Sequence, residues 1–242
     1  MLDRLISARL KLARAREHFK ALKLETDAFV ATQPYRITSY ADVEQGWHVF
    51  RFEASQAPPI RLSVIAGDAV NSVNAALDHL VYALSVTKPP QGTGFPVFVS
   101  VNDYGAYRDR LLDGVPAWPD RAIIDAYQPY ERALDLDPLR LMRTFSNADK
   151  HRVTQPTYGR PKSLRIQQPP GYTGQVIPPK IDGPLYDGAE LFRVRLTGPD
   201  PPEGGVDVYT RLNLTIAYGD QLIDNVDIGG MILLAAEIID AF

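Results

Sequence analysis

The chain of 242 residues contains no cysteine, which excludes disulfide bonds, thiolate metal ligands and cysteine nucleophiles. It has only four histidines, so each one stands out as a candidate for acid–base chemistry near neutral pH. Neither sign of charge dominates, because 26 basic and 29 acidic residues give a net charge of −3. No domain-wide basic field therefore favours non-specific binding of nucleic acid, although a local basic patch is compatible with these totals.

Long hydrophobic runs and a leader sequence are missing as well. The apolar run Met231–Ala236 is far too short to span a bilayer. The first residues, Met1–Leu5, form an amphipathic start that does not have the pattern of a signal peptide. We therefore expect a soluble, cytoplasmic protein without a membrane segment. With 45% hydrophobic residues, the chain has enough apolar side chains for one large domain or two small ones.

The first 150 residues are predicted to be mainly helical. Apolar spacing and proline positions indicate helices over residues 2–31, 58–86, 102–113, 118–127 and 137–150, and a hairpin of two strands over 35–41 and 46–54. Asn102 and Asp137 are the predicted N-caps of two of these helices.

The later part of the chain is predicted to be rich in strands. Alternating apolar residues indicate strands over 153–158, 163–168, 191–197 and 206–217, with a Pro/Gly-rich loop over 169–188 and a closing helix over 225–241. Helices that come early and strands with short connections favour an α+β fold with an antiparallel sheet. No Gly-x-Gly-x-x-Gly follows a predicted strand, which argues against a dinucleotide-binding fold. The expected division is a helical region over 1–152, hairpin included, and a strand-rich region over 153–242, packed as one unit.

Within the second helix, apolar and polar side chains are predicted to lie on opposite faces. The apolar arc contains Val70, Val73, Leu77, Leu80, Val81 and Leu84, and the polar face contains Asp68, Asn71, Ser72, Asp78, His79 and Tyr82. One interpretation is a solvated surface. The other is a cleft in which Asp78 or Asn71 orients His79 for proton transfer.

A second group of polar residues lies on the helix predicted over 137–150. Arg143, Asn147 and His151 are spaced i, i+4 and i+8 and therefore share one face. Arginine offers a fixed fork of donors that suits phosphate, so this face is a candidate phosphate site. The alternative is helix capping, because cations such as His151 and Arg152 are favoured at a helix C-terminus.

Other chemistries fit the sequence less well. Asp78, His79, Asp149 and His151 offer oxygen and nitrogen ligands, but their spacing matches no zinc pattern such as His-Glu-x-x-His. A Ser/His/Asp triad has no Gly-x-Ser-x-Gly elbow to support it. We therefore expect no metal and no cofactor.

Several short motifs resemble the sequence pattern of a group of uncharacterised bacterial and phage proteins. The resemblance covers about residues 1–155, and its pieces are Pro34-Tyr35, Gly67-Asp68, Leu77-Asp-His-Leu-Val81, Phe95-Pro96, Gln128-Pro-Tyr130 and Asp149-Lys-His-Arg152. The Arg-x-x-x-x-His spacing of that pattern is in turn similar to the HEPN superfamily. This resemblance implies a helical bundle that often dimerises and that in many members is a metal-independent ribonuclease.

The resemblance places His79 at the motif histidine, but Asn74 occupies the motif arginine. Asparagine supplies no cation to a developing phosphorane. The expected function is therefore a non-catalytic HEPN-like module of a bacterial or phage system that binds RNA, a nucleotide or a protein partner. Its expected binding residues are Asn71, Asn74, Asn147 and Arg152. The alternative is a ribonuclease in which His79, oriented by Asp78, transfers protons while Arg143 and His151 hold the phosphate.

Overall fold

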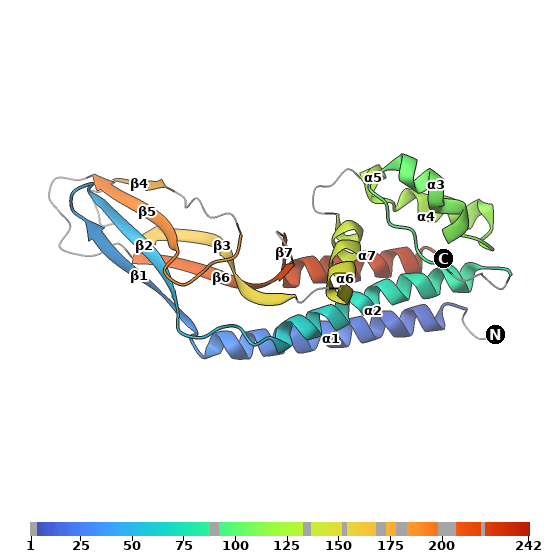
Figure 1. Cartoon of the computed structure of the whole chain (residues 1–242), viewed down its shortest axis with the longest axis horizontal. Helices are drawn as coiled ribbons and strands as arrows, with labels where there is room; N and C mark the ends of the chain where they lie inside the picture. The colour runs from blue at the N-terminus through green and yellow to red at the C-terminus, as the bar shows by residue number, and fades with distance from the viewer. Residues whose placement is uncertain are drawn as a thin grey trace. The chain divides into compact units, whose positions relative to one another are not determined.

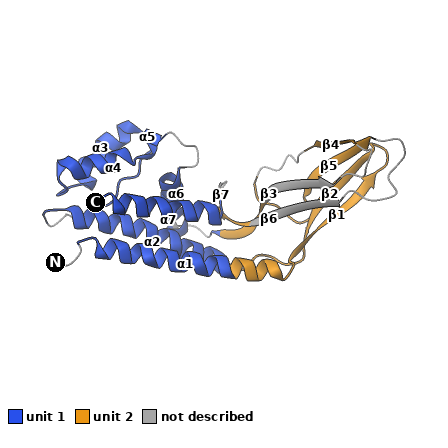
Figure 2. Cartoon of the chain, turned by 180° about the vertical axis from the view of Figure 1, so that it is seen from behind, with its two compact units in different colours: residues 1–24, 61–154, 223–242 blue, residues 25–60, 155–222 orange. Residues whose placement is uncertain are grey.

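The computed structural model describes residues 4–87, 92–132, 137–151, 154–167, 173–177, 183–197, 207–218 and 221–242. Helices and antiparallel sheets make up an α+β fold, which confirms the predicted fold class (Figure 1). The chain divides into two compact units, each built from separate stretches of sequence (Figure 2). Unit 1 comprises residues 1–24, 61–154 and 223–242, and unit 2 comprises residues 25–60 and 155–222.

Unit 1 is helical. Its helices are α2 (Arg61–Leu84), α3 (Val101–Leu111), α4 (Ala122–Ala126), α5 (Pro129–Arg132), α6 (Pro138–His151), α7 (Asn225–Asp240) and the first part of α1 (Ile6–Ala31). Figure 1 shows α1, α2 and α7 side by side, and α6 packs against both α2 and α7. Among the described helices, none is both long and apolar enough to cross a membrane.

The core of unit 1 forms around α2. This helix is buried on more than one side, because α1, α6 and α7 surround it. Val73, Leu77 and Leu80 are completely buried. Burying each such side chain contributes about 1.5–3 kcal/mol, so α2 supplies a large share of the apolar contact that holds the helices together.

Side-chain caps mark where several helices of unit 1 begin. The Asp137 carboxylate accepts hydrogen bonds from the backbone N–H groups of Leu139 and Arg140 at 2.9 and 3.1 Å, which confirms Asp137 as an N-cap. The predicted cap Asn102 is wrong. Helix α3 begins one residue earlier than expected, and Ser100 accepts the hydrogen bond from the N–H of Asp103.

Unit 2 is built from antiparallel strands. One sheet has the order β1 (Tyr35–Asp42), β2 (Trp47–Ala54), β5 (Glu190–Thr197), β4 (Thr173–Ile177). A second sheet has the order β3 (Gln155–Gln167), β6 (Asp207–Tyr218), β7 (Gln221–Ile223). The two strands predicted over 153–158 and 163–168 form the single strand β3, which pairs with β6 through register shifts near Pro161. The predicted loop over 169–188 contains β4, which is only five residues long and gains its backbone partners from β5.

The two units do not follow the expected division at residue 152. Strand β2 pairs with β5, so the early hairpin joins the late strands. Helix α7 packs on α2 and α6, so the last helix joins the early helices. The pairing of β2 with β5 and the packing of α7 on α2 connect residues that are more than 100 positions apart, and hydrophobic periodicity carries no information about such pairings.

An aromatic cluster forms the core of unit 2. Phe50 and Phe192 stack with ring centroids 4.7 Å apart, and Phe52 lies 4.9 Å from the ring of Tyr158. The Tyr158 hydroxyl donates to the carbonyl of Gln56 at 2.8 Å, and burial raises the pKa of Tyr158 to about 12. Tyr158 thus fastens the start of β3 to the chain that follows β2.

Gln33, which follows the end of α1, adopts a positive φ of 52°. A side chain in this left-handed region costs about 1–2 kcal/mol, of which the greater freedom of unfolded glycine cancels part. We therefore expect Gln33→Gly to raise the free energy of unfolding by about 0.5–1 kcal/mol in urea denaturation. Gln33→Ala keeps the Cβ atom and should show no such gain; equal gains from both variants would contradict this explanation.

Candidate functional site around His79

The polar side chains predicted to share one face of α2 lie in different surroundings. Consecutive residues of a helix point about 100° apart, so Asp78 and His79 diverge. His79 lies next to α1, whereas Asp78 lies next to Phe95 and on the side of α6. In the described part of the chain, neither Asp78 nor Asn71 is the hydrogen-bond partner of His79.

His79 is instead oriented by Ser7 of α1. The Ser7 hydroxyl oxygen lies 2.7 Å from Nδ1 of His79, and the imidazole is half-buried while Ser7 is exposed. This bond holds the ring in one orientation and leaves Nε2 as the ring nitrogen that can meet a ligand. Ser7 is not recognisable as this partner from the sequence, because nothing in the spacing of the two residues shows that α1 and α2 are neighbours.

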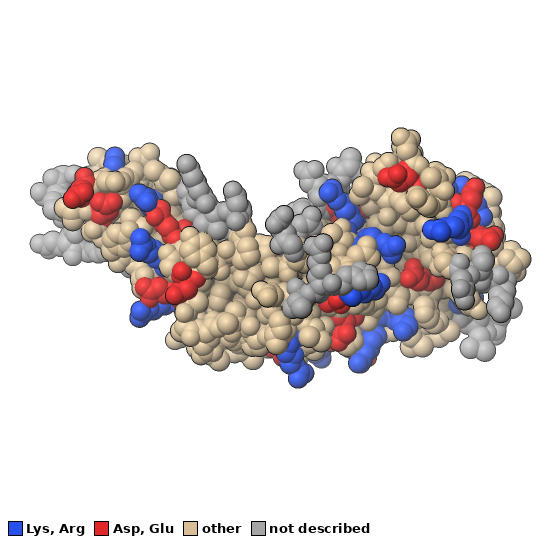
Figure 3. Space-filling view, in the orientation of Figure 1, with Lys and Arg blue, Asp and Glu red and all other residues tan. Residues whose placement is uncertain are grey.

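Helix α1, which contributes Ser7, carries a concentration of positive charge along its first part. Residues 4–24 contain seven basic residues and one acidic residue, a local charge of +6 in a chain of net charge −3. All seven cations are exposed, namely Arg4, Arg9, Lys11, Arg14, Arg16, Lys20 and Lys23. Figure 3 shows Lys and Arg side chains along the lower edge of the molecule, over α1. In the sequence these residues have the spacing of ordinary polar positions between the apolar residues of an amphipathic helix.

Because Ser7 contacts His79, the cations of α1 that matter most are those on the same face of α1 as Ser7. Lys11 and Arg14 follow Ser7 by four and seven positions, and Arg4 lies in the turn before α1. Arg14 forms an ion pair with Glu17 at 2.7 Å. For Arg4 and Lys11, no carboxylate among the described residues lies within ion-pair distance. Arg4 and Lys11, without an ion-pair partner in the described part of the chain, therefore flank Ser7 in and just before α1.

An aromatic side chain completes the surroundings of His79. Tyr82 lies three positions after His79 on α2, and its side chain is 65% exposed. An exposed aromatic ring at this position offers a flat surface on which a nucleobase can stack. His79, Ser7, Tyr82 and the cations Arg4 and Lys11 make up what we call the α1–α2 site.

Asp78 has a structural task on the other side of α2. Its carboxylate accepts hydrogen bonds from the N–H of Phe95 at 2.9 Å and from the Asn74 amide at 3.0 Å. Burial raises the pKa of Asp78, while the bond from Phe95 and the charge of Arg143 oppose that rise. A Cβ atom on Gly94 would come within 2.8 Å of the carboxylate. Asp78 therefore anchors the segment that begins at Gly94, and Asn74 is committed to Asp78.

Asn71 joins α2 to α6. Its amide donates to the Asp149 carboxylate at 2.8 Å, and its carbonyl oxygen accepts from the Ser146 hydroxyl at 2.7 Å. Gly67, one turn earlier, allows this close approach, since a Cβ atom there would lie 2.5 Å from an Asp149 oxygen. The polar groups of this seam thus satisfy one another.

The predicted phosphate site on α6 is described only in part. Arg143, Asn147 and Lys150 are exposed, and the charges of Arg143 and Lys150 act on Asp78. The side chain of His151 and all of Arg152 lie outside the described residues. The expectation that His151 shares a cleft with His79 therefore stays a prediction.

The motif pieces contact one another through structural bonds. Besides the Gly67–Asp149 and Asp78–Phe95 contacts, the buried Gln128 amide donates to the Pro96 carbonyl at 2.9 Å. The same amide accepts a hydrogen bond from the N–H of Phe98 at 3.3 Å. Several of these motif residues thus have a structural role, because their contacts hold α2, the 94–98 segment, α6 and Gln128 after α4 together.

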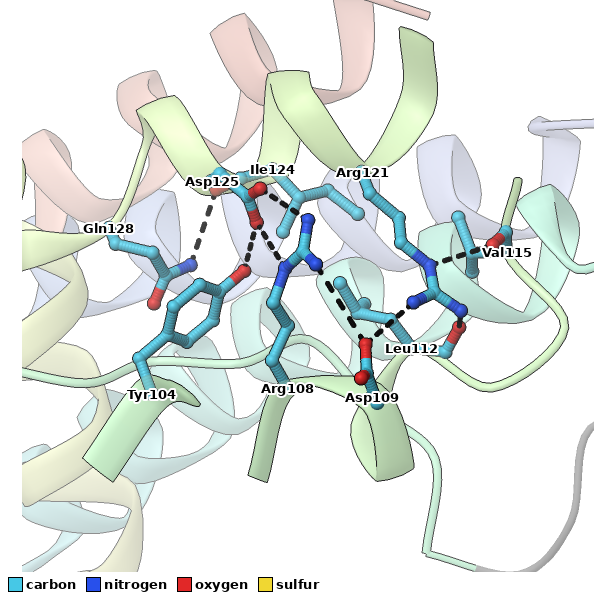
Figure 4. A network of polar contacts seen from close by, with 9 residues as sticks. All are labelled: Tyr104, Arg108, Asp109, Leu112, Val115, Arg121, Ile124, Asp125 and Gln128. Carbon is cyan, nitrogen blue, oxygen red and sulfur yellow. Dashed lines mark hydrogen bonds and ion pairs between the residues drawn. The ribbon is translucent and has the colours of Figure 1, made fainter. Parts of the chain in front are cut away.

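A further polar network joins α3 to α4, as Figure 4 shows. Asp125 accepts hydrogen bonds from the Tyr104 hydroxyl and from two nitrogens of Arg108. Burial and the neighbouring carboxylate raise the pKa of Tyr104, so this tyrosine stays protonated. Arg121 donates to Asp109 at 2.8 Å and to backbone carbonyls at 2.8 and 2.9 Å. With its groups paired internally, the network stabilises the fold and leaves little capacity for a ligand.

No group of three or more His, Asp or Glu side chains in the described residues is arranged to hold a metal ion. Comparisons of the chain with protein-family models, with curated proteins and with solved structures found no match.

The close contact at Gly67 leads to a test of the α2–α6 seam. Alanine normally stabilises a helix interior by up to about 1 kcal/mol relative to glycine. We expect Gly67→Ala to lower the free energy of unfolding by about 1–3 kcal/mol instead, because its Cβ would overlap Asp149. Gly105→Ala in α3, where a Cβ meets nothing, should be neutral or stabilising. When Asp149→Ala is also present, Gly67→Ala should lower the free energy of unfolding by less. An equal loss with and without Asp149→Ala would contradict the overlap with Asp149.

The raised pKa of Asp78 gives a prediction with a definite sign. Asp78 contributes to the free energy of unfolding when the pH is below the pKa that it has in the unfolded chain. This contribution is lost as the pH rises through the higher pKa of the folded protein. Asp78→Asn removes that loss and keeps an acceptor for the Phe95 N–H, so its stability relative to the unmodified protein should be higher at pH 7 than at pH 3. Asp78→Ala leaves the N–H without this acceptor and should cost about 1–3 kcal/mol. Urea denaturation at both pH values measures these differences.

Proposed function

We propose that the helical unit is a non-catalytic, HEPN-like binding module whose ligand is single-stranded RNA, bound at the α1–α2 site. The observation that carries the proposal is the local charge of +6 on residues 4–24, in the helix whose Ser7 contacts the half-buried His79. A cluster of cations of one sign attracts the phosphate backbone electrostatically, even when the whole protein is slightly acidic.

Three side chains of the site give it a preference for RNA over a simple anion. Tyr82 offers a ring for base stacking, which tolerates any sequence. Nε2 of His79 and the Ser7 hydroxyl are placed to hydrogen-bond with a 2′-hydroxyl or a phosphate oxygen. Lys11 contributes a point charge without a carboxylate partner among the described residues.

Two features support binding without catalysis. Asn74 stands where the motif arginine is expected, about 140° around the helix axis from His79, and its amide donates to Asp78. The position that would supply the catalytic cation is therefore neutral and occupied by a structural bond. Asp78 is likewise engaged with Phe95, and among the described residues no carboxylate forms a hydrogen bond with His79 to orient it as a general base.

The alternative function is a metal-independent ribonuclease. The observation in its favour is that Nε2 of His79 faces no described partner while Arg4 and Lys11 supply cations from α1, in place of the motif arginine. A base and a cation near the phosphate are each worth two or more orders of magnitude in rate.

The homodimer implied by the HEPN resemblance would need an interface other than the exposed face of α1. A twofold axis through that face would bring the cations of two copies together, and like charges in contact are repulsive. Bound RNA would reduce this repulsion by neutralising the cations.

The test is the salt dependence of binding, measured by fluorescence anisotropy with a labelled single-stranded RNA of mixed sequence. Each phosphate contact contributes about 0.7 to the slope of log K against log salt concentration for a single strand. We expect the double variant Arg4→Ala/Lys11→Ala to weaken binding and to reduce the slope by about 1.4. The matched double variant Arg143→Ala/Lys150→Ala on α6 also removes one arginine and one lysine and should leave the slope unchanged.

The same RNA distinguishes binding from cleavage. In EDTA we expect no cleavage by the unmodified chain, and weaker binding by Tyr82→Ala and His79→Ala. Cleavage that His79→Ala abolishes and Asn74→Arg increases would establish the ribonuclease instead. A larger loss from the α6 variant than from the α1 variant would move the site to α6, and the absence of RNA binding would overturn both functions.

A further inference from the structure

Unit 2 contains an open cleft that is independent of the α1–α2 site. Its volume is about 460 Å³, within the range of small-molecule sites. The cleft is lined by the start of β1, the end of β2 and the turn before β5. The side chains that decide its chemistry are Gln33, Tyr35, Arg36, Glu53, Ser55 and Asp187.

Backbone bonds hold the three segments around the cleft in fixed positions. The N–H of Ser55 donates to the Pro34 carbonyl at 2.9 Å. The N–H of Ala54 donates to one oxygen of the Asp187 carboxylate at 2.9 Å, and the N–H of Gly188 donates to the Phe52 carbonyl at 2.8 Å. The walls of the cleft are therefore organised before any ligand arrives, which lowers the entropic cost of binding.

Some polar groups of the cleft are engaged and others have unused capacity. Nε of Arg36 donates to Glu53 at 2.6 Å, and the Thr38 hydroxyl donates to the other Glu53 oxygen at 3.0 Å. These bonds lower the pKa of Glu53 and occupy both of its oxygens. The terminal nitrogens of Arg36 and the second oxygen of Asp187 have no protein partner among the described residues.

The charges and the unused hydrogen-bonding groups of the cleft disfavour several kinds of ligand. An anion would meet the Glu53 and Asp187 carboxylates against a single guanidinium, so its binding is disfavoured. An apolar ligand would leave Arg36 and Asp187 without partners while it covers them. A hard metal ion prefers six or more oxygen ligands, and Glu53 is already paired with Arg36.

Neutral hydroxyl groups of a ligand can pair with the unused donors of Arg36 and the unused acceptor oxygen of Asp187. Each hydroxyl both donates and accepts, so one ligand can accept from Arg36 and donate to Asp187. The planar guanidinium presents adjacent donors in a fixed fork, which matches two neighbouring oxygens. Tyr35 is half-buried in the cleft and is held by ring contacts to Phe52 and Tyr158 at 5.7 and 5.6 Å, so it offers a rigid ring beside these groups. We propose that this cleft is a binding site for a saccharide.

The side chain of Gln33 also lines the cleft. Its φ of 52° lies in the left-handed region that favours glycine, and its N–H donates to the Val30 carbonyl at the end of α1. Glycine would adopt this φ at lower cost but would remove the amide from the cleft. The amide of Gln33 offers both a donor and an acceptor, the combination that binds hydroxyl groups.

The experiment uses saturation-transfer NMR on the full chain with maltose, cellobiose, lactose and diacetylchitobiose as probes. Each is titrated to about 10 mM, tenfold above a Kd of about 1 mM. Putrescine serves as a fifth probe, because the uncompensated Asp187 charge would also attract an amine. We expect at least one disaccharide to bind and putrescine to show no saturable binding.

The variants assign the binding to the cleft. Asp187→Asn keeps an oxygen for the Ala54 N–H but loses the free acceptor, and it should weaken saccharide binding at least tenfold. Glu44→Gln removes the same charge at an exposed turn of unit 2 and should have no effect. Gln33→Gly should weaken binding while the protein stays folded and at least as stable. Binding of putrescine alone, of no probe, or equally by Asp187→Asn and the unmodified chain would overturn the proposal.

Discussion

The helical unit depends on one constraint: α2 packs against several other helices, so the polar side chains that lie in these contacts need partners within the protein. Asp78 meets this requirement with the N–H of Phe95, Asn71 with Asp149 and Ser146, and His79 with Ser7. A buried polar group without a partner costs free energy, so each of these bonds selects a neighbour for α2. Together they place the 94–98 segment, α6 and α1 around one helix.

This constraint changes the meaning of the residues that attract attention in the sequence. A carboxylate beside a histidine has the composition of an acid–base pair, yet the helix turns the two side chains toward different neighbours. Asp78 and Asn74 then serve the packing, while His79 lies at the surface beside cations of another helix. The charge of +6 on residues 4–24 contrasts with a net charge of −3, and it gives the exposed surface of the first part of α1 an electrostatic character that the total charge conceals.

The strand-rich unit shows a different balance between stability and surface chemistry. Its aromatic cluster is well packed, and Tyr158 ties β3 to the chain after β2 through the Gln56 carbonyl. Close to that cluster, Gln33 keeps a backbone conformation that glycine would adopt at lower cost.

The α+β class and most helices and strands can be predicted from the amino-acid sequence, because apolar periodicity and proline positions act locally. The cap Asp137 can be predicted for the same reason, since a cap needs only the next few residues. His79 and Asp78 also stand out in the sequence, but the prediction that Asp78 orients His79 does not match the hydrogen bonds of the described residues. Their partners Ser7 and Phe95, the pairing of β2 with β5 and the packing of α7 on α2 were decided only by the tertiary structure. These contacts join residues far apart in the chain, and they depend on which surfaces fit and which polar groups remain to be satisfied, so no local pattern contains them.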